Sequence, residues 1–197
     1  MCDNTWPDKL RFALRNHLTN DKINYITAEF TGFEDLDENK KSALLEEAMR
    51  RLDKENIEPD KLAGILAECS CGCYEEHLIE LKRVYRESRD IDRLIDAMHG
   101  RVFLNRPERQ GNVVYITKSP RFSEKHAAAE TAQEKRYCFC HCDNARAAKN
   151  MPLTYCLCGA GWCKNIWEKV LERPVRVEIT DSVLQGGATC RFAVYLD

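Results

Sequence analysis

The last quarter of the chain restricts the fold most, because it joins an amphipathic helix to two closing strands. Apolar residues recur at helical spacing from Trp162 to Arg173, which predicts a helix that stops before Pro174. Two runs, 175–180 and 190–196, then alternate apolar and polar residues around a glycine turn. Such a pair predicts an antiparallel hairpin. The residues expected on its buried face are Val177, Ile179, Phe192 and Val194.

The stretch before this helix, from Tyr155 to Cys163, carries three cysteines and two glycines. The alternation of Cys156 and Cys158 predicts a thiol-bearing strand, and Gly159 and Gly161 predict a tight turn into the helix. The sequence therefore suggests that a site is built on this unit.

The N-terminal half has the spacing of helices, expected at 8–30, 39–54, 60–84 with a break near Gly72, and 88–99. Strands are expected at 101–105 and 113–118, and a surface helix or mobile loop at 119–135. The predicted fold class is α+β, with a helical N-terminal half packed on an antiparallel sheet that carries one C-terminal amphipathic helix and a closing hairpin. Residues 1–100 would form a helical lobe and 101–197 a ligand- or metal-binding lobe of one integrated domain.

The charge distribution excludes some classes of partner. Net charge is about −7 over residues 1–100 and about +5 over 101–197. The acidic half and the absence of a basic stripe argue against nucleic-acid binding. The positive excess fits an anionic ligand or ordinary surface charge. No apolar run is long enough for a membrane span, and the N-terminus does not read as a signal peptide, so a cytoplasmic location is expected.

Eleven cysteines are unusual for a cytoplasmic chain, where disulfides are disfavoured and metal or redox chemistry is the expected use of many thiols. They fall into three groups, around residues 69–73, 138–142 and 156–158, while Cys163 and Cys190 are expected in the core. If the second and third groups were paired strands, their thiols would share one face. The candidate metal ligands are Cys69, Cys73, Cys138, Cys140, Cys142, Cys156 and Cys158.

The spacing of these thiols leaves their chemistry open. Alternate strand residues lie about 7 Å apart, whereas thiolates on one zinc ion lie within about 4 Å, so an ideal strand would have to bend. Zinc is the default metal, because a closed thiolate tetrahedron suits it. An iron–sulfur cluster also takes four thiolates and is the main alternative. Redox-active thiols and inert buried thiols remain the other interpretations.

The run Cys158-Gly159-Ala160-Gly161-Trp162, with Arg173-Pro174-Val175 and Leu184-Gln185-Gly186 further on, resembles the end of 4-vinyl reductase-type ligand-binding domains. It is more similar still to uncharacterised cysteine-rich bacterial relatives of that group, and distantly similar to L-2-amino-thiazoline-4-carboxylic acid hydrolase-like proteins. The resemblance covers residues 136–197 best. It implies an α+β fold with a buried small-molecule pocket, allows a homodimer, and implies that cysteines bind metal.

The function expected from these observations is a small-molecule-binding or sensory domain with a thiolate metal site beside an apolar pocket. Trp162 and Trp167 are expected to line part of that pocket. The alternative is a thiol-dependent enzyme, a hydrolase or redox protein, that uses a cysteine nucleophile. Such a nucleophile needs a nearby base or another cause of a lowered pKa, and His126 and His141 are the candidates by sequence.

Overall fold

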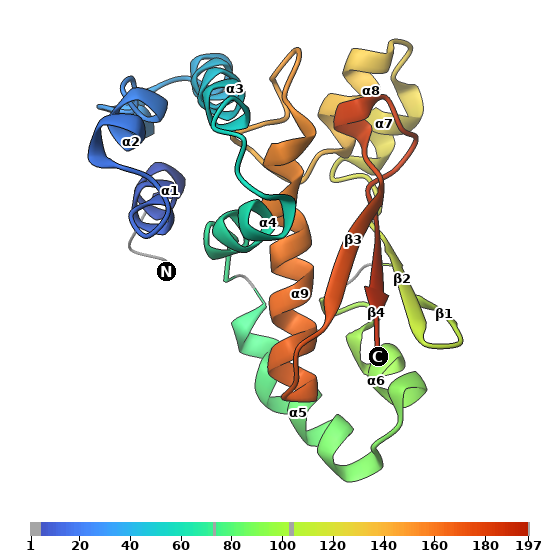
Figure 1. The fold of residues 1–197 in the computed structure, drawn as a ribbon. Coiled ribbons are helices and arrows are strands. Elements are labelled where there is room, and N and C mark those ends of the chain that lie inside the picture. Colours follow the sequence, from blue (N-terminus) through green and yellow to red (C-terminus); the bar gives the residue numbers. More distant parts are fainter. Residues whose placement is uncertain (1–4, 73, 103–104, 197) are drawn as a thin grey trace.

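The computed structural model describes residues 5–72, 74–102 and 105–196, and its fold is α+β, as predicted. Helices dominate the first half of the chain and an antiparallel sheet closes the second (Figure 1). The helices are α1 Trp6–Leu14, α2 Asn20–Ile26, α3 Glu38–Asp53, α4 Pro59–Glu68, α5 Glu75–Ser88, α6 Ile91–Met98, α7 Ser123–Ala128, α8 Ala132–Phe139 and α9 Leu157–Leu171. The strands are β1 Glu108–Gln110, β2 Val113–Thr117, β3 Arg176–Asp181 and β4 Arg191–Tyr195.

The local sequence explains where most helices begin. Asp37 accepts a hydrogen bond from the Lys40 backbone N–H at the start of α3, and Pro59 occupies the first turn of α4, where its missing N–H costs nothing. The predicted break near Gly72 separates α4 from α5, so that prediction is confirmed. The predicted helix over 8–30 is instead two short helices, α1 and α2.

The strand predictions before residue 120 were partly wrong. The predicted strand over 101–105 is absent at residues 101, 102 and 105, and residues 103–104 lie outside the described part of the chain. Strand β1 forms instead at Glu108–Gln110, between the two expected strands, and β2 confirms the run 113–118.

The C-terminal hairpin forms as predicted. The sheet has the order β1-β2-β4-β3, and β3 pairs with β4 so that Val177 faces Val194 and Ile179 faces Phe192. Phe192 and Val194 are buried, Val177 and Ile179 are half-buried, and the alternate residues of β3 are exposed. The alternation of hydrophobic residues therefore predicted correctly which face of the hairpin is buried.

Helix α9 runs lengthwise between the sheet and the helices α4 and α5 (Figure 1). It begins at Leu157, so the predicted strand over Cys156–Cys158 and the glycine turn after it were wrong. Gly159 and Gly161 lie inside the helix. A Cβ atom at position 161 would stand 2.3 Å from the Ala67 Cα of α4, so the glycine there permits a close crossing of the two helices. Glu172 ends the helix in a left-handed conformation, two residues before Pro174.

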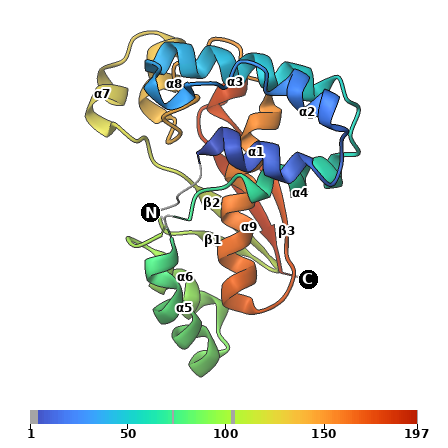
Figure 2. The same ribbon diagram turned by 90° about the vertical axis from the view of Figure 1, so that its left-hand side faces the viewer.

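The buried residues form two large hydrophobic clusters and one small one. The first joins α1 to α4 with residues 142–158, and the second joins α5, α6 and the sheet to α9. Figure 2 shows these two helix groups at opposite ends of α9. The third cluster contains Phe139, Cys140 and Val183. The division at residue 100 stays a prediction, although α5 and α6 pack with the sheet rather than with the earlier helices. Among the described residues, no helix has the length and apolar character of a membrane span.

Candidate functional site: a cysteine-lined cavity

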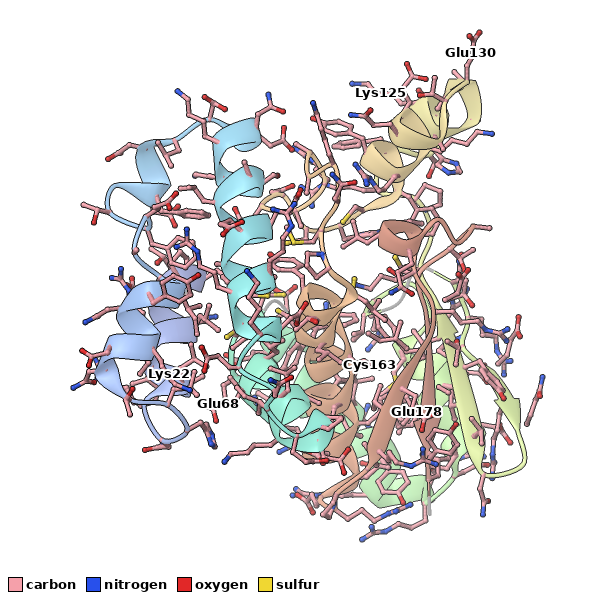
Figure 3. All side chains as sticks on the ribbon, turned by 45° about the horizontal axis from the view of Figure 1, so that its top comes forward. Lys22, Glu68, Lys125, Glu130, Cys163 and Glu178 are labelled. Carbon is pink, nitrogen blue, oxygen red and sulfur yellow. The ribbon has the colours of Figure 1, made fainter. Side chains whose placement is uncertain are left out.

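A cavity of about 660 Å³ lies where the three hydrophobic clusters meet, and its walls contain an unusual number of thiols. In Figure 3 the yellow sulfur atoms gather in the interior, between the N-terminal helices and the sheet. The volume is in the range of small-molecule pockets in proteins. The cysteines that line the cavity are Cys69, Cys71, Cys140, Cys142, Cys156, Cys158 and Cys190.

Four separate segments bring these thiols together. Cys69 caps the end of α4, and Cys71 follows it in the loop to α5. Cys140 and Cys142 lie after the end of α8, and Cys190 directly precedes β4. The remaining two, Cys156 and Cys158, lie at the start of α9.

The predicted strand over residues 138–142 was wrong, because the chain there is the last turn of a helix followed by a loop. Thr131 and Glu134 form a capping box that begins α8, and the helix continues to Phe139. As a result the three alternating cysteines do not share one face. Cys140 and Cys142 line the cavity, whereas Cys138 is buried in α8 and is not among the lining residues.

The other predicted site residues are divided between the cavity and the core. Trp162 is half-buried and lines the cavity, as expected for a pocket residue. Trp167 is fully buried in the second cluster and does not line the cavity. Cys69 lines the cavity, and Cys73 lies outside the described residues.

Five of the cavity thiols have a neighbouring group that favours the thiolate. Cys142 Sγ lies 2.8 Å from the Tyr155 hydroxyl oxygen, and Cys156 Sγ lies 3.4 Å from the Ser182 hydroxyl oxygen. The Trp6 indole lies beside the Cys158 sulfur and offsets part of the rise that burial causes in the pKa of that thiol. Burial raises the pKa of Cys140 and of Cys190, and backbone hydrogen bonds from Cys142 and Val183 offset part of that rise. Donors of this kind hold and tune thiolate ligands in metal sites.

Burial outweighs the effect of these neighbouring groups on the pKa of the thiols. It raises the pKa of Cys142 to about 11 and that of Cys156 and of Cys158 to about 12. Neighbouring thiols add to the rise, because Cys140 and Cys190 would repel a thiolate at Cys156. Without a cation to bind them, these thiols stay protonated at neutral pH and are poor nucleophiles.

Two buried cysteines differ from this group. Cys69 Sγ donates to the Ile65 carbonyl oxygen at 3.7 Å, and burial raises its pKa well above the usual range. Cys163 is fully buried in α9 outside the cavity (labelled in Figure 3), and burial raises its pKa to about 12. Neither has a hydrogen bond that favours the thiolate. We interpret Cys163 as a core residue, as the sequence predicted.

The raised pKa of Cys163 predicts a loss of stability in alkali. The unfolded chain releases this proton near pH 9.0 and the folded chain near 12, so folding is favoured below pH 9 and this stabilisation is lost as the pH rises from 9 to 12. Between pH 8 and pH 10, the unfolding free energy of the wild type should fall by about 1 kcal/mol more than that of Cys163→Ala. Urea unfolding of reduced protein in chelator measures the difference. Equal losses of unfolding free energy in the two proteins would contradict the raised pKa of Cys163.

The cavity also contains cationic and aromatic side chains. Lys118, just after β2, places its Nζ 4.8 Å from the centroid of the Trp162 ring and 5.6 Å from that of Phe192. His141 Nε2 lies 2.7 Å from the Ser119 carbonyl oxygen. Burial lowers the pKa of His141, so this imidazole is neutral at pH 7.

The thiols are not arranged as a ready site for one ion. Among the residues that the structure describes, no three His, Cys, Asp or Glu side chains are placed so that they could hold a metal ion. A single zinc ion would therefore require the cavity to contract around it. The donor type still suits a soft metal, because thiolates select zinc, copper(I) and iron–sulfur clusters.

Sequence reasoning missed several residues of the cavity. Cys190 was expected in the core and Cys71 was not among the candidate ligands, yet both line the cavity. No sequence pattern around Lys118 or Tyr155 indicated that either residue belongs to a site. Comparison with known proteins gives no further guide, because no family model, no curated protein and no solved structure matches this chain.

Proposed function

We propose that the protein is a small-molecule-binding or sensory domain whose cysteine-lined cavity holds a thiophilic metal centre. One observation carries the proposal: in the described part of the chain, seven thiols from four separate segments line a single cavity. Packing alone does not require this convergence, because valine or leucine would fill the same walls. The likeness to 4-vinyl reductase-type domains supports a small-molecule pocket in the same half of the chain.

The ligands are proposed to come from the five thiols with thiolate-favouring neighbours, namely Cys140, Cys142, Cys156, Cys158 and Cys190. A bound cation would replace the thiol protons. The metal–sulfur bonds would then offset the free-energy cost of burying the thiolates. An iron–sulfur cluster is favoured over a single zinc ion, because a cluster separates its ligand sulfurs by its own width and so suits thiols that do not surround one point.

The thiol-dependent enzyme is the weaker candidate. Burial raises the pKa of Cys142, Cys156 and Cys158, whereas a nucleophilic cysteine needs a lowered one. His141 is engaged with the Ser119 carbonyl oxygen, and His126 is not among the residues that line the cavity.

Metal content of protein purified without oxygen tests the proposal. We expect more than one iron per chain together with acid-labile sulfide, or one zinc if the cavity contracts around a single ion. Cys142→Ala and Cys156→Ala should each lower metal affinity at least about tenfold, and Tyr155→Phe about 10–100-fold if its hydroxyl supports the ligand. Cys163→Ala is the control, because that thiol is more deeply buried than Cys142 and Cys156 but lies outside the cavity.

Two outcomes would contradict the proposal. Less than one metal per chain, both after anaerobic purification and after reconstitution with iron and sulfide or with zinc, would exclude a resident metal centre. Equal metal loss in Cys156→Ala and Cys163→Ala would assign the effect to folding rather than to ligation. Elemental analysis and visible absorption spectra distinguish iron–sulfur, zinc and metal-free protein.

A further inference from the structure

The ammonium group of Lys118 is placed inside the cavity in an unusual setting. Its backbone N–H donates to the Cys190 carbonyl oxygen at 3.0 Å, which fixes the start of the side chain beside β4. The ammonium then lies against the Trp162 and Phe192 rings, two apolar walls of the cavity. Ring faces attract a cation but accept few of its hydrogen bonds, so N–H donors remain for another partner.

The charges around the cavity do not balance. Counting only the residues that the structure describes, its lining contains three cations, Lys9, Lys118 and Arg121, and one carboxylate, Asp143. The Lys9 ammonium donates to the Ser70 carbonyl oxygen at 3.0 Å, and Arg121 forms an ion pair with Asp143 at 3.2 Å. Within the described parts of the chain, Lys118 Nζ has no carboxylate at ion-pairing distance.

We propose that the small-molecule ligand of this cavity is an organic anion, whose carboxylate or other acidic group pairs with Lys118 and whose apolar body packs on Trp162 and Phe192. A charge in this partly enclosed, low-dielectric space gains more from an ion pair than it would at the surface. The inference rests on the proposed function only in that the same cavity is the binding site. It also requires that the Lys118 ammonium pair with the ligand rather than with the thiolates of a metal centre.

The test uses two acids, phenylacetate and hexanoate, each compared with its neutral amide. Calorimetry and ligand-observed NMR measure their affinity for the reduced full-length protein, both metal-loaded and in chelator. We expect each acid to bind at least about tenfold more tightly than its amide, because only the acid forms the charged pair. Lys118→Met should remove this preference, and Lys118→Arg should retain part of it.

Lys125→Met is the matched control, because Lys125 is an exposed lysine that points away from the cavity on α7 (Figure 3). It should leave both affinities unchanged. Equal binding of acid and amide, no binding of either acid, or equal binding of inorganic phosphate and phenylacetate would overturn the proposal. If metal loading abolishes acid binding and Lys118→Met lowers metal content, Lys118 serves the thiolate centre and the anion proposal is wrong. Metal content is measured separately, so failure of one proposal is distinguishable from failure of the other.

Discussion

A Trp167→Ala variant is expected to lose about 3–5 kcal/mol of its free energy of unfolding, the largest change that a single substitution in α9 should cause. The Trp167 side chain is fully buried between the sheet and the helices of the second cluster, so truncation leaves a large void. Its indole N–H is buried without a hydrogen-bond partner among the described residues. Trp167→Phe therefore keeps most of the packing, removes the unsatisfied donor, and should cost less than the alanine variant.

Trp162→Ala provides the comparison for this result. Trp162 is half-buried on the cavity wall and packs edge-on against Tyr74, with 6.4 Å between ring centroids. We expect a stability loss of only about 1–2 kcal/mol from it, together with weaker binding of phenylacetate. Urea unfolding of both variants gives the difference. Equal stability losses would show that the two tryptophans have the same packing role, against their placement in the structure.

The second large effect is expected from two glycines of the same helix. Alanine at position 161 would place its Cβ within 2.5 Å of two carbon atoms of Ala67, so α4 and α9 would have to separate. We expect Gly161→Ala to cost about 1–3 kcal/mol. Alanine at position 159 would meet only the Phe192 Cζ at 3.5 Å, an ordinary contact, so Gly159→Ala should gain about 0.5 kcal/mol from better helix propensity.

Thermal and urea unfolding of these two variants check the sign of each change. Because the substitution is the same and the positions are two residues apart, helix propensity alone predicts stabilisation in both. A stable Gly161→Ala variant would show that the two helices do not cross as closely as described. A strongly destabilised Gly159→Ala variant would show that the start of α9 needs the glycine for another reason.

The hairpin and most helices were predictable because their periodicity is local. Val177 alternates with Arg176 and Glu178, and alternation determines which face is buried. The start of α9 was not predictable in this way. Gly161 reads as a turn residue from sequence alone, and its role becomes visible only beside Ala67, which lies far away along the chain. Tertiary packing there overrides the low helix propensity of glycine.

The candidate site was predicted in its chemistry but not in its geometry. Clustered cysteines pointed to one shared thiol site, and five of the seven candidate ligands do line one cavity. The alternating cysteines at 138–142 and 156–158 were interpreted as strands. Cysteine spacing indicates backbone conformation only where the residues between the cysteines are clearly polar, and Phe139 and Leu157 are apolar. Cys190 and Lys118 join the site through strand pairing between β2 and β4, a contact that no short motif encodes.

The order of the four thiol segments along the chain also limits when the cavity can exist during synthesis. Its walls need Cys69 from the first half of the chain and Cys190 from the segment that enters β4. A ribosome-bound chain that stops short of β4 can fold α1 to α4 locally, but it cannot close the wall that Phe192 provides. The complete cavity can therefore form only after β4 has been made.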